Sequence, residues 1–290
     1  MFKILYIILS MDKIIDNYSS FGNKIYYHHT VSKRTDKDYV FGPESHSQLE
    51  ILYLLSDGIE YVIEGEHYNV NCGDAIVVLP HEIHTIISKT GYVYERVVIV
   101  FDINAVYGVI SENTELLELF SSKVKGKRVI PKNVIDNSPL KDIFYAIMNT
   151  KQSEKYRGLS IASKIIDLTV ELDKLLSSDD VELLHPSSVD PLIIDIIKYV
   201  DKHITDQLSL SDIAKKLFVS KSTLCHKFKN SMNMTLNQYY SIKKIKLAEG
   251  LIKSGLTAVE AGFKVGYNNY LTFYYNYKRI TGHSPSQAKK

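Results

Sequence analysis

Two short segments near the end of the chain combine hydrogen-bonding and cationic side chains at helical spacing. At 100° per residue, Leu224 and Phe228 lie on one face of the first segment, and Phe273 and Tyr277 lie on one face of the second. Neither opposite face contains an acidic residue, although an ordinary solvated helix face would be expected to mix Glu with Lys. The opposite faces carry Lys221, Ser222, His226, Lys229 and Asn230 in the first segment, and Asn268, Asn269, Leu271, Tyr275, Lys278 and Arg279 in the second.

These two faces have the chemistry that reads a DNA major groove. Short polar groups can bond to base edges, and cations can bond to phosphates. We therefore predict that all eleven residues contact DNA. A plain helical bundle with a lysine-rich solvated surface is the alternative.

The elements that position these faces form two copies of one unit. Residues 209–214 resemble residues 257–262, and each copy continues through a tight turn into a second helix with an apolar stripe. Helix-start residues occur at Ser209, Ser220, Thr235 and Thr257. Each copy therefore has the order of elements of a helix-turn-helix motif. The helix expected between the units, residues 238–253, would span about 24 Å at 1.5 Å per residue. Such a spacer suits two successive major-groove segments, which lie about 34 Å apart.

The charge is divided unevenly along the 290 residues, whose net charge is only +2. Residues 190–290 hold 16 Lys and Arg against 7 Asp and Glu, whereas residues 1–189 hold 19 against 26. A basic end on an acidic body predicts contact with a polyanion.

The composition excludes several classes of protein. Hydrophobic residues make up 45% and charged residues 23% of the chain, which is the balance of a soluble globular protein. Two cysteines, Cys72 and Cys225, exclude a disulfide scaffold and a multi-cysteine zinc site. No apolar run reaches the roughly 18 residues of a membrane span. The apolar start, Phe2–Leu9, is interpreted as a strand or as leader sequence before Met11, and not as a membrane anchor.

Residues 26–102 have the texture of a β-sandwich or small barrel. Short runs rich in Ile, Val, Tyr and Leu alternate with Gly- and Asp-containing turns, as is typical of such folds. The predicted strands are Glu50–Leu55, Glu60–Ile63, Ala75–Leu79, Thr85–Ser88 and Tyr92–Phe101.

Helical signals follow the strands. Glu112–Ser122 is a short helical run, and an apolar stripe recurs at spacings of 3 and 4 between Leu159 and Leu176. This stripe packs either against its own domain or against a second copy in a dimer, and the sequence leaves both open. Residues 177–189 are polar and acidic and contain Pro, which indicates a domain boundary.

Residues 190–290 resemble the DNA-binding domain of the AraC/XylS family of bacterial transcription regulators. Three positions depart from the family's usual residues: Tyr275 replaces Arg, Asn233 replaces Gly, and Ala261-Gly262 replaces Ile-Ala. The matching residues are Pro191, Leu210–Ala214, Val219-Ser220, Leu224, Phe228-Lys229, Tyr239, Ala248, Val265–Tyr267, Phe273, Tyr277-Lys278, Gly282 and Ser284-Pro285.

The resemblance implies a double-stranded promoter as partner, two recognition helices at residues 221–230 and 269–279, a homodimer, and RNA polymerase as a downstream partner. It also implies a small-molecule effector, for which a sugar is one candidate. The expected location is the bacterial cytoplasm, with the protein on the nucleoid when it is bound to DNA and not at a membrane.

The N-terminal part resembles the cupin-like sensing domain of such regulators through Glu44-Ser-His46-x3-Glu50, Gly73-Asp74 and Pro80-x3-His84. Two His and one carboxylate could hold Fe, Mn or Zn. Glu44, however, stands where metal-binding cupins have a first His. We therefore predict that His46, Glu50 and His84 line an effector site, and we expect no metal and no cofactor.

These inferences predict an α+β multidomain chain. Its parts are a cupin-like β-barrel sensing domain at 20–105, a helical dimerisation segment at 106–178, a linker at 179–189 and an all-α double helix-turn-helix domain at 190–290. The predicted function is a sequence-specific DNA-binding transcription regulator that is not an enzyme. The alternatives are a metal-dependent cupin enzyme with a helical appendage and, with less support because the motif is doubled, a purely structural dimer.

Overall fold

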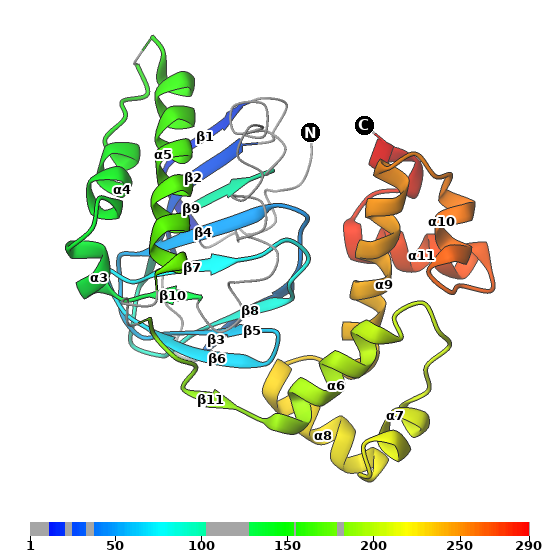
Figure 1. Cartoon of the computed structure of the whole chain (residues 1–290). Helices are drawn as coiled ribbons and strands as arrows, with labels where there is room; N and C mark the ends of the chain where they lie inside the picture. The colour runs from blue at the N-terminus through cyan, green and yellow to red at the C-terminus, as the bar shows by residue number, and fades with distance from the viewer. Residues whose placement is uncertain are drawn as a thin grey trace.

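The computed structural model describes residues 12–20, 25–32, 38–102, 128–153, 155–178 and 183–289. Among the described residues, a β-rich part comes first, helices α3 to α5 follow, and a second helical part completes the chain (Figure 1). The expected first strand at Phe2–Leu9 and the expected helix at Glu112–Ser122 lie outside the described residues.

The β-rich part consists of two antiparallel sheets that face each other as an open barrel (Figure 1). The predicted fold class is therefore confirmed, and each of the five predicted strands matches an observed strand within two residues at either end. The larger sheet has the order β1 (Asp12–Ser20), β2 (Ile25–Ser32), β9 (Tyr94–Phe101), β4 (Leu49–Leu54), β7 (Ala75–Val78) and β10 (Val129–Ile130). The smaller sheet has the order β11 (Ser188–Val189), β6 (Glu66–Val70), β5 (Ile59–Ile63), β8 (His84–Ser88) and β3 (Tyr39–Glu44).

The central strands of the larger sheet, β9, β4 and β7, are buried on both faces, and their side chains alternate between two cores. In β4, Leu49, Ile51 and Tyr53 pack toward the helices that cover the sheet, whereas Leu52 and Leu54 point into the space between the sheets. Glu50 is only 1% exposed and shares the inward face with these two leucines. The period-2 pattern therefore delivers one carboxylate to the barrel interior.

Three helices cover the outer face of the larger sheet (Figure 1): α3 (Lys132–Asp136), α4 (Leu140–Met148) and α5 (Arg157–Ser177). The stripe on α5 is fully buried at Ile161, Ile165, Leu168 and Leu172, all in the same core as the sheet. The stripe therefore packs against its own domain, and the alternative that this face forms a dimer seam is wrong.

The ends of the β-rich part differ from the expected boundaries. Strand β1 begins at Asp12, before residue 20, and pairs along its length with β2. The expected linker at 179–189 is described from residue 183 onward, and its last two residues form β11, which pairs with β6. The chain thus stays attached to the barrel until it enters the helical domain.

In the helical domain, helices begin at the four predicted start residues, Ser209, Ser220, Thr235 and Thr257, and two further helices begin at Asp190 and Asn269. The side chains of Asp190, Ser209, Ser220, Thr235, Thr257 and Asn269 each accept a hydrogen bond from a backbone N–H in the first turn of the helix that follows. The helices are α6 (Pro191–Lys202), α7 (Leu210–Lys216), α8 (Lys221–Met232), α9 (Leu236–Lys253), α10 (Ala258–Lys264) and α11 (Tyr270–Thr281), with a last 3-10 turn at Pro285–Lys289. Among the helices described, none combines the length and the apolar character that a bilayer crossing requires.

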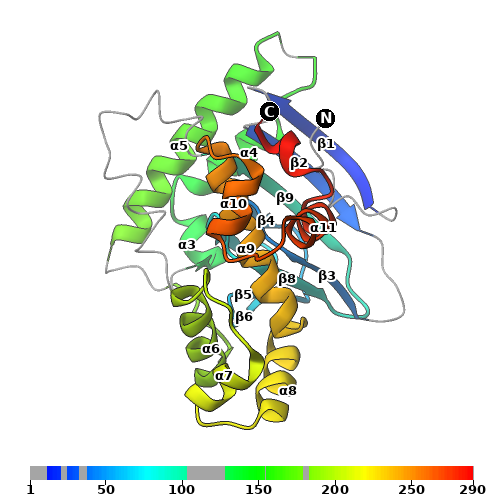
Figure 2. The ribbon, with the colours of Figure 1, turned by 90° about the vertical axis from the view of Figure 1, so that its right-hand side faces the viewer.

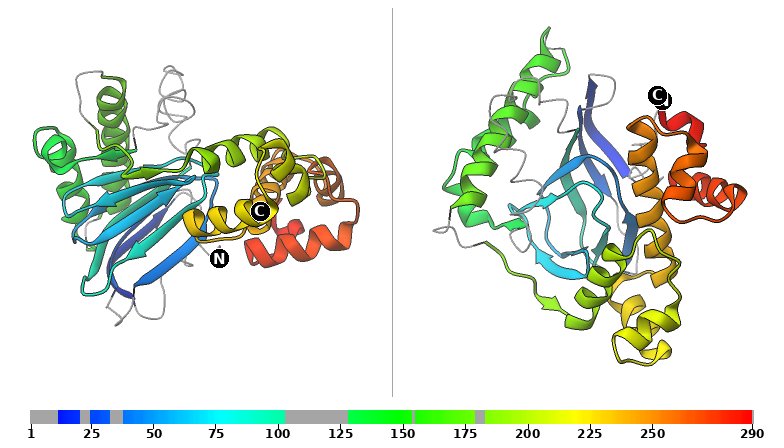
Figure 3. Two further views of the ribbon diagram at one scale, coloured as in Figure 1. Left: turned by 90° about the horizontal axis from the view of Figure 1, so that it is seen from below. Right: turned by 45° about the vertical axis from the view of Figure 1, so that its right-hand side comes forward.

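The barrel packs directly against the first part of the helical domain (Figure 3, right). Ile83, which precedes β8, is 1% exposed and belongs to the core formed by α6, α7, α8 and α9. Gly65, in the turn between β5 and β6, is so close to Ile193 that an added Cβ would lie 2.7 Å from its Cγ2 atom. The two domains therefore share a core contact in addition to their covalent connection.

Candidate functional site

The structure exposes all eleven residues that the sequence predicts to contact DNA. On α8 the buried side chains are Leu224, Phe228 and Met232, and on α11 they are Phe273 and Tyr277. The helices contain no acidic residue, so both solvent faces are neutral or cationic. The exposed set is Lys221, Ser222, His226, Lys229, Asn230, Asn268, Asn269, Leu271, Tyr275, Lys278 and Arg279.

Helices α8 and α11 lie on the same side of α9, whereas α7 and α10 lie on the other. The view along the right-hand side of the molecule and the view from below agree on this arrangement (Figures 2 and 3, left). Helix α9 has 18 residues and therefore spans about 27 Å, close to one turn of B-DNA at about 34 Å. Both faces can therefore meet one face of a duplex.

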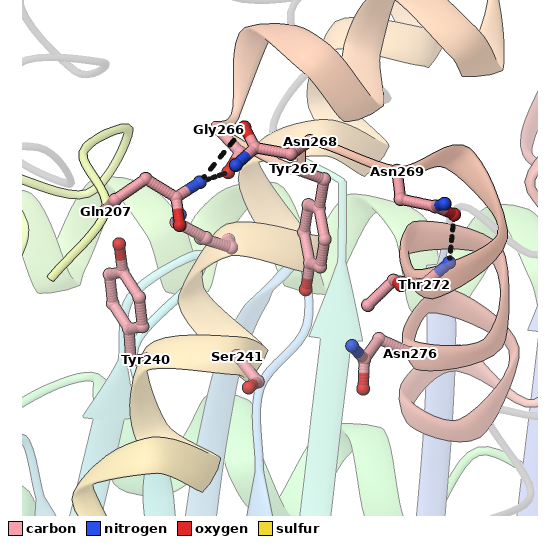
Figure 4. A pocket seen from close by; sticks show the side chains of 10 residues that line it. Gln207, Tyr240, Ser241, Gly266, Tyr267, Asn268, Asn269, Thr272 and Asn276 are labelled. Atoms are coloured by element: carbon pink, nitrogen blue, oxygen red, sulfur yellow. Dashed lines mark hydrogen bonds between the residues drawn. The ribbon is translucent and has the colours of Figure 1, made fainter. Parts of the chain in front are cut away.

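The two units are held together by more than α9. The Gln207 amide, in the loop after α6, donates to the carbonyl of Gly266 in the turn of the second unit. The Lys244 ammonium on α9 donates to the carbonyl of Asp206 at 2.9 Å and lies over the Tyr240 ring at 4.5 Å. These contacts border a polar groove of about 330 Å³ that Tyr267 and the cap of α11 also line (Figure 4). The spacing of α8 and α11 is thus set by direct contacts.

A second group of polar side chains lies inside the barrel. The inward residues of β2, β4, β8 and β9 include His28, Thr30, Glu50, His84 and Arg96, and all five are at most 2% exposed. The Arg96 guanidinium donates to the Ser32 hydroxyl at 2.6 Å and stacks on the Tyr94 ring at 4.1 Å. Apolar cores of small barrels hold few such groups, so this interior has the character of a binding site.

The structure brings the three predicted effector residues together. The His46 Nε2 atom lies 2.6 Å from Glu50 Oε2, and the His84 Nε2 atom lies 3.9 Å from the same oxygen. The two imidazole rings meet edge to face, with centroids 5.3 Å apart. His46 follows β3, Glu50 is on β4 and His84 opens β8, so the cluster joins the two sheets.

Burial and charge shift the titration of this cluster in opposite directions. Burial would raise the pKa of Glu50, but the hydrogen bond and charge of His46 lower that pKa to about 2. Burial, together with the nearby Glu50 carboxylate, raises the pKa of Glu44 to about 7. Burial, aided by Arg96, lowers the pKa of His28 to about 3. Burial opposes the charge of His46, but its hydrogen bond to Glu50 raises the pKa of this imidazole. The interior therefore holds a charged pair, His46 and Glu50, beside Glu44 and His28, which favour their neutral forms.

Comparisons with known proteins identify both parts of the chain. Residues 27–165 match the AraC-like ligand binding domain, and residues 213–290 match a helix-turn-helix domain. The chain belongs to the AraC family of transcription regulators. It combines the ligand-binding domain and the helix-turn-helix DNA-binding domain of that family.

Some relatives of this AraC-family regulator match nearly the whole chain, and others match about half of it. The Msm operon regulatory protein of Streptococcus mutans is 22% identical over 268 residues, which cover 90% of this chain and 91% of the relative. The arabinose operon regulatory protein of Escherichia coli is 25% identical over 151 residues, 51% of this chain and 50% of that protein. A crystal structure of unsaturated fatty acid bound ToxT from Vibrio cholerae is 14% identical, with a TM-score of 0.39, covering 94% of this chain and 95% of that one.

Two departures of the regulator from the usual family residues have a local explanation. Asn233 ends α8 with φ at +51°, a left-handed conformation that Asn tolerates better than most residues after Gly. Gly262 on α10 lies against Phe273, and an added Cβ would sit 2.9 Å from that ring. The small residue thus lets α10 approach α11 closely. Tyr275 is 67% exposed on the predicted DNA face.

Sequence reasoning missed the residues of the regulator that join the barrel to α9. The Glu64 carboxylate accepts from the Tyr239 hydroxyl at 2.6 Å and from the Lys243 ammonium at 2.8 Å. It also accepts from the backbone N–H of Ile83 at 2.8 Å. Glu64 belongs to the turn Glu64-Gly65-Glu66, whose composition resembles any exposed hairpin turn, so the sequence carries no signal for this role.

Proposed function

We propose that this AraC-family regulator binds promoter DNA as a homodimer, and that a small-molecule effector inside the barrel changes its affinity for the promoter. One observation carries the proposal: two acid-free faces, on α8 and α11, lie exposed on the same side of α9, while the barrel contacts that same helix. The first face provides hydroxyl, amide, imidazole and ammonium groups, and the second adds Arg279, so each can contact both bases and phosphates.

The effector would act through the contact between the barrel and α9. Residues on both sides of the His46–Glu50–His84 cluster reach the helical domain: the Ser47 hydroxyl accepts from Lys253 at 3.2 Å, and Ile83 packs in the core around α8. An effector changes DNA affinity only if it binds two arrangements of the domains with different affinity. A ligand that moves β8 would therefore change how α8 packs against the barrel.

The proposal also includes the chemical class of the effector and the other partners of the regulator. The name of the arabinose operon regulatory protein supports a sugar as effector, and the polar barrel interior with its tyrosines is compatible with one. RNA polymerase as a partner, the cytoplasm as location and the absence of an enzymatic activity are part of the same proposal, and they are supported by what the resemblance to the AraC/XylS family implies.

The test is fluorescence anisotropy with the DNA upstream of the regulator's own gene. Lys229→Ala and His226→Ala on α8 are expected to weaken binding by about 5- to 150-fold each, since one lost specific contact costs about 1–3 kcal/mol. Lys229→Ala should also lower the dependence of affinity on salt by about one phosphate contact. Lys198→Ala, an exposed lysine on α6, is the matched control and should bind like the parent chain.

Two results would overturn this function. Binding that shows no salt dependence would exclude an interface with phosphates. Equal affinity of both α8 variants and the Lys198 control would show that the predicted face does not touch DNA. Far-ultraviolet circular dichroism of each variant separates these results from unfolding.

A further inference from the structure

We propose that the polar groove between the two helix-turn-helix units binds one phosphodiester group of the DNA backbone, where that backbone passes between the two major-groove segments. Lys244 is the cationic ligand of this phosphate. The inference rests on the proposed function, because the groove meets a backbone phosphate only when a duplex lies along α8 and α11. It adds α9 to the DNA-binding surface, since none of the eleven residues predicted to contact DNA lies on that helix.

The groove opens beside the predicted DNA face of α11. Its volume of about 330 Å³ has room for a phosphate group. The loop before α7 contributes Gln207 to its lining, α9 contributes Ser241 and Lys244, and the residues that precede α11 contribute Asn268 and Asn269 (Figure 4). Because Asn268 and Asn269 are predicted DNA contacts, the groove continues the surface that α11 would turn toward the duplex.

A duplex would bring phosphates to this part of the molecule. Two major-groove segments on one side of B-DNA are separated by a minor groove and by the two backbones that border it. The duplex carries one negative charge per about 1.7 Å of its axis. A protein with one recognition helix in each segment therefore faces phosphates along the region that joins the helices. In this chain that region is α9 and the turn that leads to α11.

Lys244 is a buried cation without a counterion among the described residues. It is only 5% exposed, and its ammonium donates to the Asp206 carbonyl at 2.9 Å and lies over the Tyr240 ring at 4.5 Å. Lys243 and Lys246 on the same helix each form an ion pair with a glutamate, whereas no described carboxylate pairs with Lys244. Buried charges in proteins normally have such a partner, because burial of an unpaired charge is costly. A DNA phosphate would supply the missing anion.

The protein itself compensates little of the charge on Lys244. Burial lowers the pKa of Lys244, and the charge of Asp206 opposes this effect only in part. The Asp206 carboxylate is engaged elsewhere, since it accepts from His203 Nδ1 at 2.7 Å. A phosphate in the groove would favour the ammonium form and raise the pKa of Lys244 again.

Other groups around the groove can also bind an anion. Burial raises the pKa of Tyr267 to about 12, although Arg279 and a hydrogen bond from Asn276 oppose the rise. The phenol therefore keeps its proton near neutral pH and can donate it; its ring stands between Ser241 of α9 and Thr272 of α11 (Figure 4). The Arg279 guanidinium donates to Asn276 Oδ1 at 3.0 Å and places a second cation beside the groove. None of the described residues that line the groove is acidic.

Contacts within the protein hold the groove in shape. The Gln207 amide donates to the Gly266 carbonyl. A Cβ on Gly266 would lie 2.1 Å from the Thr205 carbonyl oxygen and 3.0 Å from Lys244 Nζ, so the turn before α11 packs directly on the loop before α7 and on the lysine. A preformed site loses little conformational entropy when it binds. The bound phosphate would therefore set the position of the second unit along the duplex.

The experiment compares the full parent chain with Lys244→Met, which keeps the apolar stem of the side chain and removes its charge. Promoter affinity in 0.1 M salt should fall about 5- to 10-fold, and the plot of log affinity against log salt should become shallower by about 0.9, the share of one phosphate contact. Stability in urea should stay the same or rise, because the lost charge is buried without a described counterion. Lys264→Met is the matched control: this lysine is exposed on α10, on the far side of α9, and its loss should change neither affinity nor slope.

Ethylation interference on the same promoter fragment locates the phosphate. Each DNA molecule carries a single ethylated, neutral phosphate, and the bound fraction shows which phosphates the protein needs. With the parent chain, interference should include a phosphate between the two major-groove segments. With Lys244→Met, interference at that phosphate should disappear while the rest of the pattern remains. Tyr267→Phe removes a donor and no charge, so it should weaken binding without changing the salt slope.

Several results would overturn the phosphate site. They are equal affinity and slope in Lys244→Met and Lys264→Met, the same interference pattern in Lys244→Met and the parent chain, and a loss of stability in Lys244→Met with an unchanged slope, which would make the lysine purely structural. Inorganic phosphate could instead stabilise the parent chain but not Lys244→Met, with no change in interference; the groove would then bind a free anion and not DNA.

Failure of the proposed function would look different. A parent chain that does not bind the promoter would remove that function, whereas promoter binding without these differences would remove only the phosphate site. If Lys244→Met fails to fold, the interference experiment is made with Tyr267→Phe, and an unchanged pattern overturns the site.

Discussion

The two helix-turn-helix units share one plan but have different surroundings. The first unit, α7 and α8, shares its core with Ile83 of the barrel, and Tyr239 and Lys243 beside it bond to Glu64. Among the residues that the structure describes, the core of the second unit, α10 and α11, is formed by side chains from Ile245 to Ala288. The first unit therefore shares core packing with the sensing domain, whereas the described barrel reaches the end of α9 beside the second unit through an exposed hydrogen bond, from Lys253 to Ser47.

The outward faces of the two units also differ in their chemistry. The face of α8 is polar and cationic, with Ser222, His226 and Lys229. The face of α11 adds two large side chains, Leu271 at 61% and Tyr275 at 67% exposure. Apolar groups read the thymine methyl group, whereas polar groups read hydrogen-bonding edges. The second unit is thus suited to sequence contacts that differ in kind from those of the first.

Removal of a buried aromatic ring from each unit should have the largest effect and should show the difference between the units. Phe228→Ala and Phe273→Ala each delete a side chain with 0% exposure and should each cost about 3–5 kcal/mol of stability. Hydrogen exchange followed by mass spectrometry is the measurement. Phe228→Ala should raise exchange in α8 and also in residues 80–84 of the barrel, because Ile83 shares that core. Phe273→Ala should raise exchange in α10 and α11 and leave the barrel unchanged.

The pair of variants serves as its own control, because ring size and burial are the same. Equal protection of residues 80–84 in the two variants would contradict the view that the first unit, and not the second, shares core packing with the barrel. The prediction would also fail if Phe273→Ala loosened β8.

Loss of the Glu64 carboxylate should have a smaller and more specific effect. In Glu64→Ala the buried Tyr239 hydroxyl and the Lys243 ammonium lose their acceptor, which should cost about 1–3 kcal/mol. We expect the contact between barrel and α9 to open while each domain stays folded. Promoter DNA affinity should then respond less to an effector, as anisotropy with and without the effector would show.

Lys253→Ala is the matched control for Glu64→Ala, at the opposite end of α9. Its ammonium bonds to Ser47 at 3.2 Å but is 46% exposed, so its removal should change stability little. The effector's influence on DNA affinity could instead fall more in Lys253→Ala than in Glu64→Ala. That result would show that the effector acts through the second unit, and it would contradict the special role given to the first.

The helical domain could be predicted from the sequence because its signals are local. Ser220 and Thr257 bond to backbone N–H groups three residues ahead, and the apolar stripes of α8 and α11 follow the helical period. The contact between the domains could not be predicted, because Glu64 and Ile83 act across more than 100 residues of sequence. The inward position of His28 and Arg96 was open to inference from the period-2 pattern of β2 and β9, but apolar runs around Arg96 hide its direction.

The predictability of the barrel site lies between these cases. The spacing of His46, Glu50 and His84 was recognisable as a pattern, and the structure brings the three residues together. Their hydrogen bonds to the carbonyls of Gln48 and Glu82 depend on the backbone path after β3 and before β8, which the spacing alone does not determine. The residues of the cluster could therefore be named from the sequence, but their orientation needed the fold.

Relief of backbone strain in the first turn should have the smallest effect. Phe218 and Gly266 occupy corresponding positions in the turns of the two units, both with positive φ, at +55° and +82°. A Cβ on Gly266 would lie 2.1 Å from the Thr205 carbonyl oxygen, so only Gly fits there. Phe218 is 96% exposed and bears the strain without a clash. Phe218→Gly should therefore raise stability by up to about 1 kcal/mol in urea unfolding, because relief of the left-handed conformation outweighs the added entropy of the unfolded chain. Phe218→Ala keeps the strain and removes the same ring, so it should show no gain; an equal gain in both variants would assign the effect to the exposed ring instead of to the backbone.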